Sequence, residues 1–348
     1  MCIYLGNQND LKYSSQEHIF PAGLGGMSKL PAKYVSDKFN NYFSKLERLF
    51  LRHSILSIPR QIVGSGKRGS LNINKVTKSL INVFKHAEKD LYSLGYIKKG
   101  KPFEIPHIVF NKATGEYSAG MDKNISSDDL ETFINQLKSF SKLRVRTICF
   151  TELKDDFIIG IQNGIEDHYD CFIAGSDPLS HPFNDGLLKR FSKILTSDDV
   201  VRSTDSFHIR THQNATIDDN IFRCGGKIAF NVLEHLTDEE FVMQKEFDIF
   251  KQWLLEGSDH EGFAFQDSSF DDDFMQIFPD QSHYVFIFKN NHELVAQVVF
   301  YNYFNCRVIL SKNYHHPFDH NGFICDWQDK KEYIFMDYLN SKSQNLNS

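Results

Sequence analysis

The residues that decide the fold lie near the N-terminus, where the chain reads SQEHIFPAGLGG (15–26) and, ten residues later, DKFNNYFSKLE (37–47). The first stretch places a carboxylate beside an imidazole, at Glu17 and His18, and then turns at a proline and several glycines. In the second stretch the apolar residues recur at spacings of three and four, which is the period of an α-helix. We therefore expect a short strand over residues 17–20, a turn, and then a helix.

Outward from these stretches, the patterns predict an α+β chain. A brief strand is expected at 3–5, and the helix is expected to run from Asp37 to about Leu56, with Ser36 or Asp37 as its cap. Residues 75–94 are expected to form another helix, and residues 95–101 a basic turn that links two domains. The remaining expected elements are strands at 105–110, 144–151, 157–162, 172–174, 284–289, 294–303 and 307–311, and helices at 127–140, 227–235 and 239–255. The strands at 284–289 and 294–303 are expected to form a hairpin around Asn290 and Asn291.

Charge is unevenly distributed along the chain. The 348 residues carry a net charge of −6, yet residues 1–101 contain 17 Lys or Arg against 6 Asp or Glu, a net charge of +11, and the rest carries −17. A basic segment of this kind is typical of a contact with a polyanion. Length predicts roughly two domains at about 150 residues each. We therefore expect a basic domain at 1–101 and a larger acidic α+β domain at 102–348, whose role as a regulatory, oligomerisation or partner- or ligand-binding domain is left open.

Composition and hydropathy exclude several classes of protein. A hydrophobic fraction of 41%, with 32 Phe and 14 Tyr, is too high for a disordered chain. No stretch of 18 uncharged apolar residues is present, so no membrane span is expected, and the N-terminus lacks the pattern of a secretory signal. The six scattered cysteines fit buried thiols in a reducing compartment better than a zinc cluster. The sequence thus predicts a cytoplasmic protein.

The residue types in the N-terminal stretches suit phosphodiester hydrolysis. An imidazole with a pKa near 6.5 activates water at neutral pH, and a metal ion offsets charge on the phosphate and the leaving oxygen. Adjacent residues of a strand point to opposite sides, so Glu17 can face a metal while His18 faces the phosphate. Asn40 or Asn41, at the helix start, supplies a second oxygen ligand. Oxygen ligands without thiolates favour Mg²⁺, or Mn²⁺, over Zn²⁺.

The same segment resembles the HNH endonucleases, whose ββα-metal fold is two strands and a helix around one divalent ion. Glu17-His18-Ile19-Phe20-Pro21 and Leu24-Gly25-Gly26 match the E-H-I-[IF]-P and L-G-G motifs of one subgroup, and Asn40 falls where the motif's asparagine falls. The resemblance covers about 50 residues. It implies that His18 is the general base and that Glu17 and Asn40 are metal ligands. Only Cys2 remains of the subgroup's four zinc cysteines, so no structural zinc is expected.

A weaker resemblance joins Arg223 and Lys227–Asn231 to the C-terminal region of longer proteins that carry this HNH type, and it implies no activity. The N-terminal resemblance implies a metal-dependent endonuclease in a bacterial or phage setting that includes antiviral defence. DNA is the favoured substrate, and RNA stays open. Two alternatives stay open. One is a non-catalytic nucleic-acid-binding protein on a decayed HNH frame. The other is a partner or ligand sensor whose output is a gated nuclease.

Basic residues around the motif are expected to contact nucleic-acid phosphates. They are Lys38, Lys45, Arg48 and Arg60, with Lys67 and Arg68 in the glycine loop 64–69. Three further residues are left open as members of the site. Asn41 could replace Asn40, Glu47 lies on the same helical face and either supports the site or forms an ordinary ion pair, and His53 lies at the helix end, where a surface histidine is the default.

Overall fold

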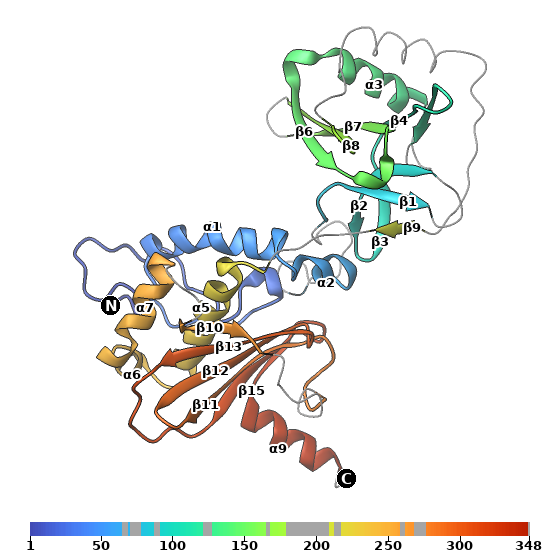
Figure 1. Ribbon diagram of the computed structural model, residues 1–348. Helices are drawn as coiled ribbons and strands as arrows, with labels where there is room; N and C mark the ends of the chain where they lie inside the picture. The colour runs from blue at the N-terminus through green and yellow to red at the C-terminus, as the bar shows by residue number, and fades with distance from the viewer. Residues whose placement is uncertain are drawn as a thin grey trace. The chain divides into compact units, whose positions relative to one another are not determined.

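The computed structural model describes residues 1–64, 69, 78–86, 91–120, 127–164, 168–178, 209–211, 217–257, 262–267 and 276–346. Within these residues the chain is an α+β protein with three β-sheets and seven α-helices. It forms two compact units: unit 1 comprises Met1–Thr77 and Ala215–Ser348, and unit 2 comprises Lys78–Asn214. Unit 2 is therefore an insertion between the two parts of unit 1 (Figure 1).

A six-stranded antiparallel sheet forms one side of unit 1, with the strand order β10-β13-β12-β11-β14-β15. Its central hairpin, β11 with β12, turns at Asn291, whose φ of 54° suits an asparagine. The hairpin expected around Asn290 and Asn291 is therefore confirmed. The strands are β10 (Ala264–Gln266), β11 (His283–Asn290), β12 (Glu293–Phe300), β13 (Phe304–Ser311), β14 (Asn321–Asp326) and β15 (Lys331–Ile334).

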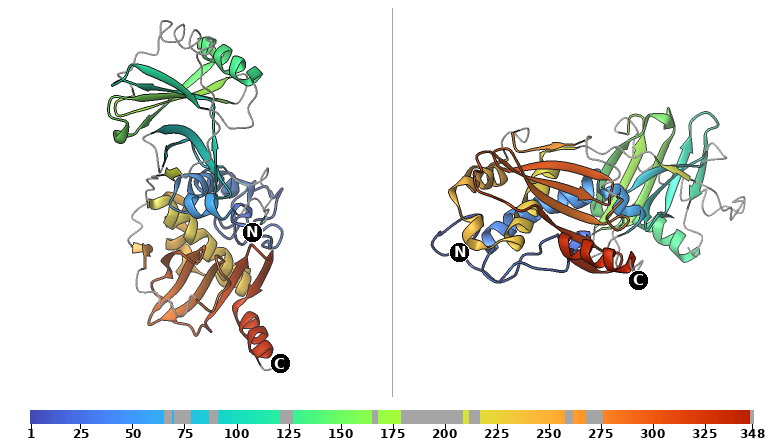
Figure 2. Two further views of the ribbon diagram at one scale, coloured as in Figure 1. Left: turned by 90° about the vertical axis from the view of Figure 1, so that its right-hand side faces the viewer. Right: turned by 90° about the horizontal axis from the view of Figure 1, so that it is seen from below.

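The two longest helices of unit 1 lie in layers over one face of this sheet. Helix α1 (Asp37–His53) begins where expected, and the Ser36 hydroxyl caps it by accepting a hydrogen bond from the Phe39 amide. Helix α5 (Asp219–Leu236) contacts both α1 and the sheet strands, and it lies between them in Figure 1 and in the left view of Figure 2. The helix expected at 239–255 is broken into two by a 3-10 turn. The remaining helices of unit 1 are α2 (Ser57–Ile62), α6 (Glu239–Val242), α7 (Asp248–Glu256) and α9 (Phe335–Leu346).

One hydrophobic core joins the two ends of the chain in unit 1. Side chains of residues 2–56, among them Phe20, Phe39 and Phe50, belong to the same buried cluster as side chains of residues 221–327. Residues 1–77 carry a net charge of +7 and residues 215–348 a net charge of −12, so the basic and acidic segments of the sequence are combined in one unit. The division expected at residue 101 instead falls within the second unit.

The N-terminal segment before α1 contains little regular structure. The strand expected at 3–5 is wrong, since these residues form a turn that is closed by the Gly6 amide on the Cys2 carbonyl. The expected strand at 17–20 is reduced to an isolated antiparallel bridge between His18 and Lys29. No HNH module is identified in the described part of this segment. What remains is one bridged turn followed by a helix.

Unit 2 contains the other two sheets. One sheet has the strand order β3-β2-β1-β9. The other has the order β5-β4-β7-β8-β6, in which β6 and β8 are parallel. Unit 2 also contains helix α3 (Ser127–Lys138). Their strands are β1 (Asn82–His86), β2 (Tyr92–Lys98), β3 (Lys101–Glu104), β4 (His107–Asn111), β5 (Glu116–Gly120), β6 (Leu143–Cys149), β7 (Phe157–Asn163), β8 (Tyr169–Gly175) and β9 (Ile209–Thr211).

The helix expected over residues 75–94 is wrong for its described part. Residues 82–86 and the first residues of β2 form an antiparallel pair, in which Val83 lies opposite Leu94. Both side chains are buried against the neighbouring sheet, and this tertiary contact decides the local structure. The expected linker at 95–101 is the hairpin between β2 and β3, which turns at Lys99 and Gly100, both with positive φ. Among all described helices, none has the length and apolar character needed to cross a membrane.

Candidate functional site

The backbone around Glu17 and His18 is held from both sides. Within the bridged turn, the Ile19 amide donates to the Ser28 carbonyl (3.0 Å) and the Leu30 amide donates to the Glu17 carbonyl (2.8 Å). The returning arm is fixed by a C-terminal residue, because both carboxylate oxygens of Glu332 accept backbone amides there, from Met27 (3.1 Å) and Ser28 (2.6 Å). The position of the candidate base therefore depends on residues far away in the sequence.

The two glycines of the motif allow this turn to pack tightly. Gly25 has a φ of 101°, which favours glycine, and a side chain there would overlap Trp327. A Cβ on Gly26 would overlap the carbonyl oxygen of Phe20. The L-G-G part of the sequence is thus explained by close approach of the backbone to its neighbours. It fixes where the residues before it lie.

Lys227 of α5 binds the carboxylates of both Glu17 and Glu47. Its Nζ lies 2.6 Å from Glu17 Oε1 and 2.5 Å from Glu47 Oε1, and its side chain is only 2% exposed. Burial by itself lowers the pKa of Lys227, but the two carboxylates and their hydrogen bonds outweigh burial and raise this pKa above its ordinary value. Glu47, left open by the sequence, is therefore part of a buried charged cluster. We call Glu17 and Glu47, joined by Lys227, the bridged carboxylate pair.

Asn231 lies one turn further along α5 and orients the same region. Its amide nitrogen donates to the carbonyl of His18 (3.1 Å), and its amide oxygen accepts from the Tyr4 hydroxyl (2.6 Å). The Tyr4 ring stacks on Phe39 of α1, with centroids 3.8 Å apart. Burial, followed by nearby acidic groups, raises the pKa of Tyr4, so its hydroxyl stays protonated and keeps donating. Asn231 thereby connects the candidate base to α1.

Asn40 lies on α1, on the face that carries Phe43 and Glu47, since the spacings are three and four. The ammonium of Lys227 lies 5.3 Å from the centre of the Phe43 ring, and Phe43 follows Asn40 by three residues on α1. The amide oxygen of Asn40 is shielded from solvent and accepts no hydrogen bond from the described residues. A buried acceptor of this kind calls for a donor or a cation.

The side-chain oxygens of Asn40 and Glu17 are of the chemical type that a hard divalent ion prefers. Within the described ranges, no group of three or more His, Cys, Asp and Glu side chains could hold a metal. The oxygen donors are the Asn40 amide and the second oxygen of Glu17, whose first oxygen binds Lys227. Mg²⁺ is bound through few protein oxygens and keeps several waters, so oxygen donors of this type suit it. Glu17 and Asn40 would be the residues that hold the ion.

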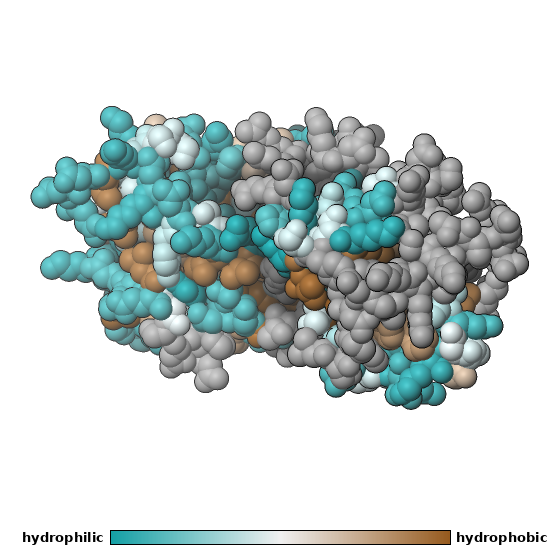
Figure 3. All heavy atoms as spheres, turned by 90° about the horizontal axis from the view of Figure 1, so that it is seen from above, coloured by the Kyte–Doolittle hydropathy of each residue, from teal (hydrophilic) through white to brown (hydrophobic). Residues whose placement is uncertain are grey.

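The basic residues expected to bind phosphate differ in position. Lys38, Lys45 and Arg48 are exposed on α1, as is Asn41. The face of unit 1 on which α1 lies is largely hydrophilic in Figure 3, with hydrophobic residues between the hydrophilic ones. Lys67 and Arg68 lie outside the described residues, and so does the side chain of His53.

Arg60 was also expected to contact phosphate, but it is buried and does not belong to the exposed basic surface. It is 7% exposed, and its guanidinium donates to the carbonyls of Gly23 (3.1 Å) and Leu51 (3.2 Å). Burial lowers the pKa of Arg60. This side chain joins the glycine turn to α1 and is not presented to a ligand. Its role is in the structure of the turn.

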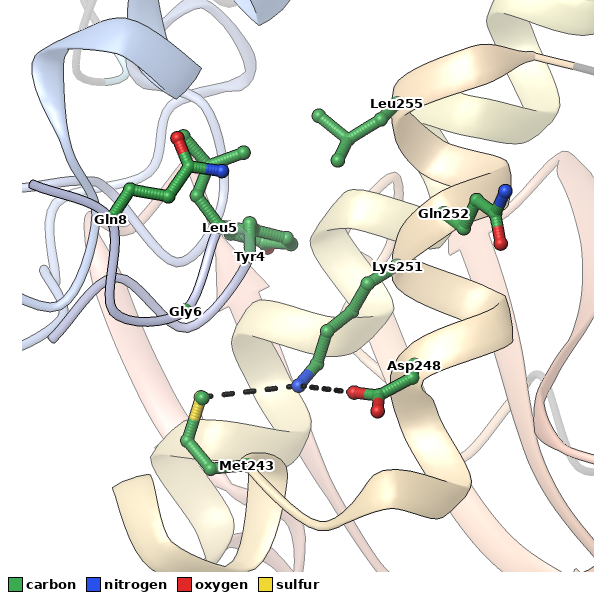
Figure 4. Close-up of a pocket in the computed structure, with 9 residues that line it drawn as sticks. All are labelled: Tyr4, Leu5, Gly6, Gln8, Met243, Asp248, Lys251, Gln252 and Leu255. Atoms are coloured by element: carbon green, nitrogen blue, oxygen red, sulfur yellow. Dashed lines mark hydrogen bonds and ion pairs between the residues drawn. The ribbon is translucent and has the colours of Figure 1, made fainter.

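A pocket of about 310 Å³ lies between the N-terminal loop and α7 (Figure 4). Lys251 points into it and is 5% exposed. Its Nζ is 3.8 Å from Asp248 Oδ1 and 3.9 Å from Met243 Sδ, distances too long for strong hydrogen bonds. Burial lowers the pKa of Lys251, and Asp248 only partly opposes this. The pocket is lined by Tyr4, Leu5, Gly6, Gln8, Met243, Asp248, Lys251, Gln252 and Leu255.

The sequence did not indicate the roles of Lys227 and Asn231, although it contains a signal for them. Arg223, Lys227 and Asn231 recur every four residues within an otherwise apolar helix, and all three are buried. Such a stripe marks a helix face that contacts polar groups. Arg223 confirms this, since its guanidinium donates to the Tyr42 hydroxyl of α1 (2.7 Å) and to the Leu254 carbonyl. The spacing of these three residues does not by itself identify the groups that they contact.

Comparisons with family models, with curated proteins and with solved structures found no match to this chain. The site is therefore interpreted from its own geometry.

Proposed function

We propose that this chain is a metal-dependent endonuclease of the HNH type, which hydrolyses phosphodiester bonds of DNA in preference to RNA. The observation that supports it is that Lys227 of α5 ties the turn carrying Glu17 and His18 to α1, the helix that carries Asn40. Glu17 and His18 are held by α5, and the buried amide oxygen of Asn40 has no donor among the described residues. In this proposal the bridged turn and α1 are a reduced ββα-metal frame. A cytoplasmic setting is proposed from the scattered cysteines and the lack of a secretory pattern, and a role in antiviral defence rests on the resemblance alone.

Each residue has one task in the proposed reaction. His18 accepts a proton from water as general base. The hydroxide formed attacks the phosphorus in line, and the bond to the 3′ oxygen breaks. A divalent ion, Mg²⁺ or Mn²⁺, would supply charge neutralisation when bound by Glu17 and Asn40. Lys38, Lys45 and Arg48 on the exposed face of α1 bind the flanking phosphates.

The test is cleavage by the full chain and by His18→Ala. Supercoiled plasmid, linear DNA and RNA are incubated with Mg²⁺, Mn²⁺ or a chelator. We expect ion-dependent cleavage that the substitution lowers by about 10²-fold or more. His292→Ala, in the turn between β11 and β12, is the matched control and should cleave as wild type. Absence of cleavage by wild type with every ion would refute the proposal.

A second candidate function is favoured by the bridged carboxylate pair. Because the ammonium of Lys227 already binds Glu17, the cluster contains its own cation, as a decayed HNH frame would. A protein of that kind would bind nucleic acid without cutting it. Binding of a labelled duplex that weakens with salt, together with no cleavage under any ion, would establish this second function.

A further inference from the structure

The net charge of the bridged carboxylate pair with Lys227 favours binding of a divalent ion first and of a phosphodiester second. Two carboxylates and one ammonium leave a net charge of minus one in a largely buried cluster, since the exposed fractions are 13%, 20% and 2% for Glu17, Glu47 and Lys227. A divalent ion changes the net charge to plus one. A phosphodiester, with one negative charge, then brings it to zero.

We propose that Lys227 is a positioning residue that tunes this centre for one divalent ion and one phosphate. It holds one oxygen of Glu17, so that only the other oxygen is offered to the ion, and it keeps the loaded centre positive toward nucleic acid. The inference rests on the proposed function, because it takes Glu17 as a ligand of the ion. It adds a residue of α5, which is 210 positions away in the sequence from Glu17.

Two substitutions shift this charge in opposite directions. Lys227→Met removes the ammonium, so the empty cluster becomes more negative and the ion-loaded cluster becomes neutral. Glu47→Gln keeps Lys227 and Glu17 but makes the empty cluster neutral. Since charges at close range in a shielded site interact strongly, each change should alter ion affinity by about tenfold or more. The first should tighten ion binding and weaken nucleic-acid binding, and the second should weaken ion binding.

The experiment measures binding and not only activity. Mn²⁺ affinity is determined by calorimetry and by the ion-dependent rise in melting temperature, for full-length wild type, Lys227→Met, Lys227→Arg and Glu47→Gln. Lys251→Met is the matched control, because Lys251 is also buried but does not contact the bridged carboxylate pair. Binding of a fluorescent DNA duplex with Mn²⁺ is then measured in the His18→Ala background.

We expect Lys227→Met to bind Mn²⁺ at least about tenfold more tightly and the duplex more weakly, with Lys227→Arg and Lys251→Met close to wild type. A purely structural lysine would lower the melting temperature without tightening ion binding, and that result would overturn the inference. If Lys227→Met does not fold, an unchanged Mn²⁺ affinity in Glu47→Gln overturns it equally. Failure of the proposed function is distinguishable, because it appears as absent cleavage by wild type while the predicted changes in ion binding persist.

Discussion

Unit 1 contains two buried lysines in different surroundings, one at the candidate site and one in the pocket beside α7. Lys227 and Lys251 are 2% and 5% exposed, and each comes from a helix that packs into the same core. Lys227 binds two carboxylates at hydrogen-bond distance, whereas Lys251 has one largely exposed carboxylate at 3.8 Å. The pKa of Lys227 is raised and the pKa of Lys251 is lowered. Burial is nearly equal at the two positions, so the distance and number of partner oxygens decide the direction.

The contrast teaches what each lysine contributes to folding. A buried charge without a good partner destabilises the folded state. When a buried ammonium is bound to carboxylates, its removal destabilises the folded state, because the carboxylates are left without a cation. Lys227 is thus required by Glu17 and Glu47, whereas Asp248, the carboxylate beside Lys251 among the described residues, is largely exposed and has less need of a cation. Substitutions of the two lysines should therefore differ strongly, and the following predictions begin with the largest effect.

Lys227→Met should lower the free energy of unfolding by about 3–5 kcal/mol, because it leaves two carboxylates buried without their cation. Chemical denaturation of the full chain, monitored by tryptophan fluorescence, measures this change. Lys227→Arg, which keeps the charge, should recover at least half of it. If Lys227→Met were as stable as wild type, the short ion pairs would contribute nothing, and the contrast with Lys251 would be lost.

Glu234 provides the opposite case on α5, a buried carboxylate that forms no ion pair within the described residues. Burial, with smaller effects of Glu239 and Asp238, raises the pKa of Glu234 to about 7, well above its ordinary value of 4.5. Between these two values the folded state binds more protons than the unfolded state, so stability should fall as pH rises from about 4.5 to 7. After a discount for solvent screening, the loss is on the order of 1–2 kcal/mol.

The measurement for Glu234 is denaturation at several pH values between 4 and 8. Glu234→Gln should remove most of this decline and should be the more stable protein at pH 8. Glu47→Gln is the control, since it removes a carboxylate that already has a cation, and it should not stabilise at pH 8. Equal slopes in wild type and Glu234→Gln would contradict the prediction.

Tyr4→Phe should lower stability by about 1 kcal/mol, because the buried amide oxygen of Asn231 loses its donor while the stacked ring remains. In the proposed nuclease it should also reduce cleavage, since Asn231 holds the His18 carbonyl. The test compares denaturation and cleavage with those of Tyr303→Phe, whose side chain is 71% exposed and should change neither. A loss of stability with full activity would show that Asn231 does not orient His18.

The sequence predicted those elements that local interactions determine. Helix α1 follows from its apolar period and its Ser36 cap, and the β11–β12 hairpin follows from its asparagine turn. The helix expected over 75–94 failed because burial of Val83 and Leu94 between strands outweighs the local pattern. The bridged carboxylate pair could not be predicted, since Lys227 is 210 and 180 residues from its partners. A local motif can name candidate ligands, but only the tertiary fold supplies the charge beside them.

The smallest change in stability is expected for substitution of the second buried lysine, Lys251. Lys251→Met keeps an unbranched side chain of similar length beside Met243. It removes a buried ammonium whose carboxylate partner among the described residues, Asp248, is 3.8 Å away and largely exposed, so stability should stay within about 1 kcal/mol or rise. The pH dependence gives a second check. Because the pKa of Lys251 is lower in the folded state, the unfolded state binds more protons near its ordinary pKa of 10.5, and wild-type stability gains a contribution as pH rises toward that value. Lys251→Met should lose this gain in alkaline denaturation, whereas exposed Lys312→Met should keep it. A loss of several kcal/mol in Lys251→Met would mean that its ammonium has a partner as important as the carboxylates of Lys227, and the two lysines would no longer be opposites.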